Sequence, residues 1–233
     1  MQPYKFSFSY YKDILKVAAQ NNYSMINCYN YFKNLEKLPK HYIILRHDIE
    51  HYPERALEFA KIEAERGVSA TYFVRVHSKD YNIYNFKDYN YLKEIMSLGH
   101  EIGLHTEAID FSKTSNEEPE RIFRKEIDLL ELVLDCKVYG VASHGDWTGY
   151  NNLDFFLDHK IEDYGLLYQA YQENFFDANI YITDGQHTYW KAYENGQLLD
   201  SQYGPDYYIK KCIPNLYLLT HDKNWYHTEY HLM

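Results

Sequence analysis

Hydrophobic and polar positions follow two different patterns along this chain. The apolar run at residues 42–45 and the segment rich in β-branched and aromatic residues at 70–76 are typical of buried strands. Elsewhere apolar residues recur every three or four positions, most clearly from Pro119 to Leu134, where the pattern predicts an amphipathic helix. The chain therefore alternates between predicted strands and predicted helices.

This alternation predicts the fold class. The predicted strands are residues 42–45, 70–76, 101–104, 138–142, 166–169, 180–183 and 216–220, with a shorter hairpin around residues 189–193. The predicted helices are residues 13–20, 53–64, 91–96, 119–134 and 153–157. The order indicates an α/β fold with a parallel sheet covered by helices, either a (β/α) barrel or a doubly wound sheet. Because the sequence contains no repeat, low-complexity tract or linker, residues 1–233 are expected to form one domain.

The composition excludes two classes of protein. With 45% hydrophobic residues, the chain can bury a core, so it is not a disordered acidic tail. Its 24 basic and 34 acidic residues leave a net charge of −10, and they include no basic run. This charge argues against nucleic acid as a partner, because binding to nucleic acid depends on neutralising phosphates.

The sequence also predicts the compartment. No stretch approaches the ~18 to 20 consecutive apolar residues of a membrane span. The first residues lack the basic start and apolar run of a signal peptide, so a cytoplasmic location is expected. Three scattered cysteines, Cys28, Cys136 and Cys212, make no disulfide framework and fit a reducing compartment.

Ionisable residues stand where nearly every predicted strand ends. In parallel α/β folds, the carboxyl ends of the strands form the functional face. Five of the twelve histidines lie at these ends, which predicts a metal or catalytic site there. The ionisable residues concerned are His47, Asp48, Glu50, His77, His105, His144, Asp184 and His221.

These residue types suit metal-assisted hydrolysis. Asp48 and Glu50 are two positions apart, so their carboxylates face the same side of an extended chain, where one could hold a metal and the other act as a base. Imidazoles from other strands would complete a site with an open position for water. A divalent metal lowers the pKa of such a water toward ~7, and a histidine acid could then assist cleavage of an amide or ester. A structural interpretation stays open, in which His47 and Asp48 are a buried ion pair and Glu50 caps the helix that begins at Pro53.

Aromatic and polar residues near these positions are candidates for contacts with a substrate. Trp147 and Trp225 each follow a candidate histidine by a few positions, and aromatic faces stack on sugar rings. His77 and Asp184 stand on the same predicted face. Ordinary packing would explain the two tryptophans at least as well. A solvated loop would explain His77 equally well, and so would a turn before Gly185 for Asp184.

Three segments carry a resemblance to a known family. They are Leu-Arg-His-Asp-Ile-Glu at 45–50, Gly-Val-Ser-Ala-Thr-Tyr-Phe-Val at 67–74 and Gly-His-Glu-Ile-Gly-Leu-His at 99–105. The chain resembles the polysaccharide deacetylases of the NodB-homology class, carbohydrate esterase family 4, and especially their divergent relatives in surface-polysaccharide gene clusters. The resemblance extends from about residue 10 to residue 221. It implies a single distorted (β/α) barrel of about seven parallel strands, with residues 1–40 as a helical extension packed on the barrel.

The resemblance also implies an activity and roles for individual residues. Members of the family remove N- or O-acetyl groups from sugars with a divalent metal, often zinc. By position, Asp48 matches the catalytic base and His221 the general acid. His105 matches the first metal histidine, and Glu50 falls where some relatives have a metal-binding aspartate.

The sequence departs from the family at two further motifs. The second metal histidine normally stands four residues after the first, where this chain has Ile109. The Arg-x-Pro motif after the fourth strand is absent, and Ala-Ser-His-Gly stands at 142–145 instead. His144 could supply the missing ligand, so the predicted metal site is Glu50, His105 and His144, with Asp48 as an alternative ligand.

The sequence therefore predicts a metal-dependent hydrolase, with zinc as the expected ion. Its predicted substrate is an acetylated sugar or a surface-polysaccharide precursor. Two alternatives stay open. One is a non-catalytic carbohydrate-binding relative on the same barrel, and the other is a hydrolase of a different C–N amide bond.

Overall fold

Seven parallel strands form the centre of the fold in the computed structural model, which describes residues 6–145, 148–176, 179–185, 189–200 and 202–227. Their order across the sheet is β6-β5-β4-β3-β2-β10-β7, as around a barrel, and among the described residues β6 and β7 do not pair. The predicted distorted (β/α) barrel of about seven parallel strands is confirmed. The strands are β2 (Tyr42–Ile49), β3 (Thr71–Arg75), β4 (Glu101–Thr106), β5 (Gly140–Ser143), β6 (Tyr168–Gln169), β7 (Ile180–Thr183) and β10 (Asn215–His221).

Three short strands extend this sheet. Strand β1 (Ser24–Ile26) pairs in parallel with the start of β2. Strands β8 (Lys191–Glu194) and β9 (Gln197–Asp200) form an antiparallel hairpin beside β7, slightly later in the chain than the expected hairpin. The first forty residues are therefore not only a helical extension, because β1 hydrogen-bonds into the sheet between two helices.

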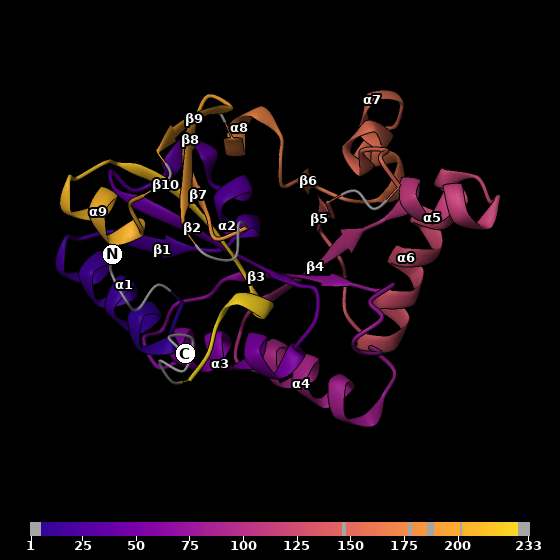
Figure 1. The fold of residues 1–233 in the computed structure, drawn as a ribbon, viewed down its shortest axis with the longest axis horizontal. Helices are drawn as coiled ribbons and strands as arrows, with labels where there is room; N and C mark the ends of the chain where they lie inside the picture. Colours follow the sequence, from indigo (N-terminus) through magenta and orange to yellow (C-terminus); the bar gives the residue numbers. More distant parts are fainter. Residues whose placement is uncertain (1–5, 146–147, 177–178, 186–188, 201, 228–233) are drawn as a thin grey trace.

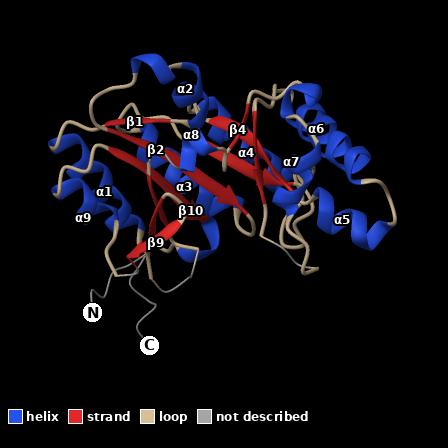
Figure 2. Cartoon of the chain, turned by 90° about the horizontal axis from the view of Figure 1, so that it is seen from above, coloured by secondary structure: helices blue, strands red, loops and turns tan. Residues whose placement is uncertain are grey.

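Most of the helices cover the outside of the barrel, as Figure 2 shows, with α1 and α9 together at one end and α5 and α6 at the other. Among the described residues, no helix combines the length and the apolar character needed to cross a membrane. The helices are α1 (Phe8–Gln20), α2 (Cys28–Lys33), α3 (Pro53–Ala64), α4 (Phe86–Ser97), α5 (Ala108–Ser115), α6 (Pro119–Leu134), α7 (Phe155–Asp158), α8 (Glu173–Phe176) and α9 (Pro205–Lys210), with short 3-10 turns η1 (Leu35–Lys37), η2 (Asn152–Asp154), η3 (Ile161–Tyr164) and η4 (Asp222–Asn224).

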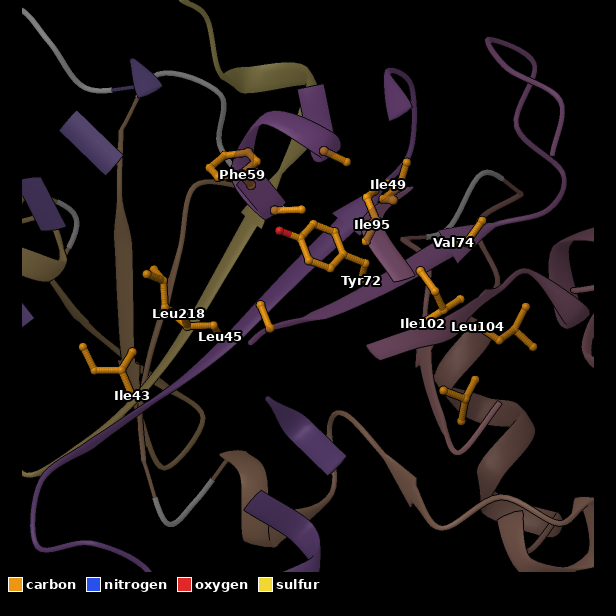
Figure 3. Close-up of a cluster of buried hydrophobic side chains, with 14 of the residues drawn as sticks. Ile43, Leu45, Ile49, Phe59, Tyr72, Val74, Ile95, Ile102, Leu104 and Leu218 are labelled. Atoms are coloured by element: carbon orange, nitrogen blue, oxygen red, sulfur yellow. The ribbon is translucent and has the colours of Figure 1, made fainter. Parts of the chain in front are cut away.

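The outer face of the sheet packs against these helices. Figure 1 shows α3 and α4 running beside β3 and β4. Alternate residues of the strands point to this side, and Figure 3 shows Leu45, Ile49, Tyr72 and Val74 facing Phe59 of α3 and other residues of the helical layer. Helix α6 buries the apolar stripe that its sequence period predicts.

The other set of alternate residues fills the barrel interior. Ile44 of β2, Phe73 of β3 and Tyr217 of β10 belong to a second, separate apolar cluster. Tyr168 of β6 lies so close to Gly140 that a Cβ atom there would come within 2.0 Å of the Tyr168 ring. The interior is therefore a packed core, and its polar residues are concentrated toward the carboxyl ends of the strands.

One carboxyl group lies near the opposite, amino end of the interior. Glu101 accepts hydrogen bonds from the Thr71 hydroxyl (2.5 Å), the Tyr168 hydroxyl (2.7 Å) and the backbone N–H of Tyr29 (3.0 Å). Burial raises the pKa of Glu101 to about 7, because the loss of solvation outweighs these hydrogen bonds to the ionised form.

The raised pKa predicts a pH-dependent stability. The ordinary pKa of the carboxyl is 4.5, whereas the folded one stays protonated up to about pH 7. The resulting stabilisation is present at low pH and is lost as the pH rises through that interval. Between about pH 5 and about pH 8, Glu101→Gln should gain at most about 3 kcal/mol relative to the wild type in urea unfolding. Glu36→Gln on the exposed turn η1 is the surface control. A constant difference between Glu101→Gln and wild type across this range would contradict the prediction.

Candidate active site

Three charged residues alternate along the end of β2. Arg46 and Asp48 share the inner face of the barrel, and Glu50 follows immediately after the strand. The pairing of β2 with β10 sets His221 beside Asp48. All three charged side chains are buried, so each needs a partner of opposite charge.

Asp48 is paired with Arg46 through both carboxylate oxygens. The Arg46 Nε and Nη2 atoms each donate to one oxygen at 2.8 Å. The guanidinium itself lies over the ring of Tyr171 and is fully buried. Burial opposes ionisation of Asp48, but the positive charge of Arg46 outweighs it and holds the pKa of the carboxyl below its usual value.

The structural interpretation of this segment is wrong. His47 points to the outer face of the sheet, where its Nε2 atom lies 2.7 Å from Glu63 and its Nδ1 atom 2.6 Å from Thr220. It therefore does not pair with Asp48. Nor does Glu50 cap helix α3, whose N-cap residue is Tyr52.

Glu50 is the centre of a histidine cluster. Its Oε1 atom lies 3.7 Å from Nε2 of His105, 3.6 Å from Nε2 of His144 and 3.8 Å from Nε2 of His221. These residues come from β4, the end of β5 and β10, three elements far apart in sequence. The structure thus brings together every residue of the predicted metal site and the predicted general acid.

The Nδ1 atom of each imidazole faces an oxygen atom, through a hydrogen bond at His105 and His221 and through an ion-pair contact at His144. The Nδ1 atom of His105 lies 3.1 Å from the carbonyl oxygen of Ala142. The Nδ1 atom of His144 lies 3.3 Å from Glu107, and that of His221 lies 2.6 Å from Asp184. Metal-binding histidines are held in this way, because the acceptor fixes the ring and leaves the second nitrogen available.

This donor set fits a divalent metal. The buried Nε2 atom of His105 has no hydrogen-bond partner among the described residues, although water cannot reach it. Bonds of 2.0–2.1 Å in a tetrahedral zinc site separate the donor atoms by about 3.3 Å, slightly less than the separations around Glu50. Burial lowers the pKa of His144, which favours the neutral imidazole that a metal needs. Asp48 is less suited as a ligand, because Arg46 already engages both of its oxygens.

A second acidic group lies beside the first. Glu107 and Asp110 approach His144, and together they have the composition of a metal site. Arg75, however, donates to both oxygens of Glu107 at 2.7 Å. Asp110 accepts from the Thr148 hydroxyl and from other donors. These contacts indicate that Glu107 and Asp110 support the site around Glu50 and do not form another.

His221 has the electrostatic surroundings of a proton donor. Burial alone would lower its pKa, but the Asp184 and Glu50 carboxylates outweigh burial and raise it to about 9. Asp184 is fully buried behind His221 and also accepts from the Trp225 indole at 2.6 Å. The predictions of Asp184 and Trp225 as substrate contacts are wrong, because both side chains are buried. Asp184 orients His221, and Trp225 in turn donates to Asp184.

Two further predicted substrate contacts have different outcomes. His77 stacks on Phe111 with ring centroids 4.3 Å apart, and its Nε2 atom lies 3.0 Å from Glu126. These contacts hold His77 against helices α5 and α6, so a role in binding substrate is not supported. Trp147 lies outside the described residues.

Three residues of the site were not assigned a role from the sequence. Arg46 stands two positions from Asp48, and Glu107 stands two positions from His105. The two-residue period of a strand was therefore a signal that each lies on the same face as its neighbour. Lys223, whose Nζ atom lies 2.6 Å from Glu50, follows β10 in the turn η4 and had no comparable signal.

The comparisons with known proteins return solved structures only. No family model and no curated protein sequence matches the chain. The deacetylase PplD of Streptococcus pyogenes, with acetate bound, has 14% identity and a TM-score of 0.47 over 63% of this chain and 65% of its own. A family 4 carbohydrate esterase of Bacillus anthracis has 18% identity and a TM-score of 0.47 over 91% of this chain and 77% of its own.

A third neighbour is a mutant of BA3943, described as a carbohydrate esterase family 4 pseudoenzyme with restored activity. It has 15% identity and a TM-score of 0.49 over 78% of this chain and 57% of its own. The chain thus spans less than two thirds of PplD and of this BA3943 mutant. The chain is similar to carbohydrate esterase family 4 deacetylases.

The Arg46–Asp48 pair gives a prediction about stability. In metal-free protein, Arg46→Met should lower the free energy of unfolding by about 3–5 kcal/mol, because it leaves a buried carboxylate without its partner. The double variant Arg46→Met with Asp48→Asn should recover part of that loss. Urea unfolding of the four proteins in a double-mutant cycle measures both effects.

Arg124→Met is the matched control. Arg124 is half exposed and lies 3.3 Å from Glu120 on the surface of α6, so its loss should cost less than about 1 kcal/mol. If Arg46→Met is no more destabilising than Arg124→Met, the interior ion pair does not stabilise Asp48 in the way described.

Proposed function

We propose that this protein is a metal-dependent hydrolase that removes an N- or O-acetyl group from a sugar or a surface-polysaccharide precursor. The observation that carries the proposal is the convergence of three imidazole Nε2 atoms on Oε1 of Glu50, beside the buried Asp48. The acetylated sugar as substrate comes from the motif resemblance of residues 45–50, 67–74 and 99–105.

Glu50, His105 and His144 are the proposed ligands. They offer one carboxylate oxygen and two neutral nitrogens, a donor set found in catalytic zinc sites, and zinc is the proposed ion. When bound, such an ion polarises a carbonyl oxygen and lowers the pKa of a water molecule. His144 takes the place of the histidine that the family resemblance would put at Ile109.

Asp48 is the proposed general base. Its pairing with Arg46 keeps the carboxylate ionised and fixes its plane, so its position relative to Glu50 and His105 does not depend on a flexible rotamer. A base held in this way can accept a proton from a water molecule that attacks the acetyl carbon. The Oδ2 atom lies 3.5 Å from Nε2 of His105, which places the base beside the proposed ligands.

His221 is the proposed general acid. Because its pKa is raised to about 9, the imidazolium form predominates at neutral pH and carries a proton on Nε2 toward the site. Asp184 holds the opposite nitrogen at 2.6 Å and stabilises the charged ring. Donation from Nε2 to the leaving nitrogen or oxygen of the sugar would complete hydrolysis.

Ile109 supports a second candidate function. This half-buried residue packs against the core and brings no ligand to the site, so the chain lacks one histidine of the family's metal site. A carbohydrate-binding protein without catalytic activity on the same barrel would fit this departure. Hydrolysis of another C–N amide bond would use the same residues as deacetylation.

The cytoplasmic location stays a prediction.

Metal binding and acetate release test the proposal. Purified wild type should bind one equivalent of zinc by elemental analysis and release acetate from acetylated sugars. His105→Ala should lose the metal. Asp48→Asn should keep the metal and lower the rate by about 10²–10⁴-fold, because it removes the base without removing a proposed ligand. Asp128→Asn on the exposed face of α6 is the matched control and should retain full activity.

The outcomes separate the candidate functions. Absence of stoichiometric metal together with background acetate release would exclude the hydrolase. A rise in melting temperature with sugar that survives both EDTA and Asp48→Asn would then favour the carbohydrate-binding protein. Turnover of cyclic amides, but of no acetylated sugar, would assign the site to another amide bond.

A further inference from the structure

The second oxygen of Glu50 has a partner that the proposed reaction does not use. While Oε1 faces the three histidines, Oε2 lies 2.6 Å from the ammonium group of Lys223. The Nε2 atom of His51 lies 3.6 Å from the same oxygen, beyond hydrogen-bond distance, and its Nδ1 atom is engaged by Asp80 at 2.5 Å. Lys223 is therefore the main partner of Oε2.

The backbone around this contact is held from both sides. The Asp222 carboxylate accepts the backbone N–H groups of Glu50 (3.3 Å) and His51 (2.9 Å). Arg55 of α3 donates to the backbone carbonyl of Lys223 at 3.1 Å. The segment after β10 is thus hydrogen-bonded to the segment after β2. These backbone contacts hold Lys223 and Glu50 close together independently of their own side-chain contact.

We infer that Lys223 is a positioning residue that restricts Glu50 to a single donor oxygen. The inference rests on the proposed function, because it concerns how Glu50 would serve a metal. It adds a residue outside the proposed ligand set, and it gives the second carboxylate oxygen a role.

The physical basis is the choice between two binding modes. A carboxylate can coordinate a metal through one oxygen or through both. A short, charge-assisted hydrogen bond to a carboxylate with 7% exposure would have to be given up before Oε2 could turn to the metal. The ammonium therefore favours the one-oxygen mode and preserves the open position that a catalytic site needs for water.

Replacing the ammonium should change the coordination. In Lys223→Met the side chain keeps much of its length and loses its charge, so Glu50 can use both oxygens. Lys223 is 26% exposed, so methionine can be accommodated there without creating a buried cavity. Acetate release should fall about tenfold to a hundredfold, as for other groups that orient a metal ligand, and Lys223→Arg should recover most of it.

Cobalt(II) provides a readout that is independent of activity. Visible absorption of bound Co²⁺ is intense in four-coordinate sites and weakens as the coordination number rises. Wild type and Lys223→Arg should give the intense spectrum, and Lys223→Met a weaker one at the same metal content. Lys210→Met is the matched control, because Lys210 pairs with Asp206 on the exposed surface of α9.

The outcomes distinguish this inference from the proposed function. If wild type takes up Co²⁺ but Lys223→Met gives the same spectrum, or if the wild-type spectrum is already weak, Lys223 does not restrict Glu50 and only the inference fails. If wild type takes up neither zinc nor Co²⁺, the proposed function fails first. Circular dichroism of each variant verifies that the spectra compare folded proteins.

Discussion

The burial of Asp48 and Glu50 is the constraint on which the carboxyl end of this barrel depends. A buried carboxylate without partners would cost several kcal/mol, so both groups must be matched by positive charge or hydrogen-bond donors. Asp48 meets this need with Arg46 through both oxygens. Glu50 meets it with the ammonium of Lys223, 2.6 Å from Oε2, and with the charged ring of His221, whose Nε2 atom lies 3.8 Å from Oε1.

The position of β2 makes these partners available. Strand β2 lies between β3 and β10, so residues after it can meet groups carried by β4, β5 and β10 at the same edge. Alternation along each strand separates two environments. Residues that point into the barrel form the second apolar cluster, which contains Phe73 and Tyr217, and the charged site. Residues that point outward pack on the helices. This apolar cluster keeps water out of the barrel interior, and the low dielectric constant strengthens the electrostatic interactions among the charged residues at the carboxyl ends of the strands.

The histidines are supported from outside the cluster by neighbouring elements. Glu107, held by Arg75, approaches His144, while Asp184, held by Trp225, orients His221. Such paired support orients the rings before any ligand binds, and it explains why Asp184 and Trp225, which look like substrate contacts in the sequence, are buried instead. Preorganisation of this kind lowers the cost of forming a reactive arrangement.

Local periodicity and the shared direction of parallel strands were enough to predict the alternation of strands and helices. They were also enough to predict that Asp48, Glu50, His105, His144 and His221 gather at one edge of the sheet. The contacts between individual side chains could be known only from the folded chain. The partners of Asp48 and Glu50, and the burial of Trp225, depend on strand register and on how loops distant in sequence meet. Side-chain pairing and burial arise from those long-range contacts, which no local pattern encodes.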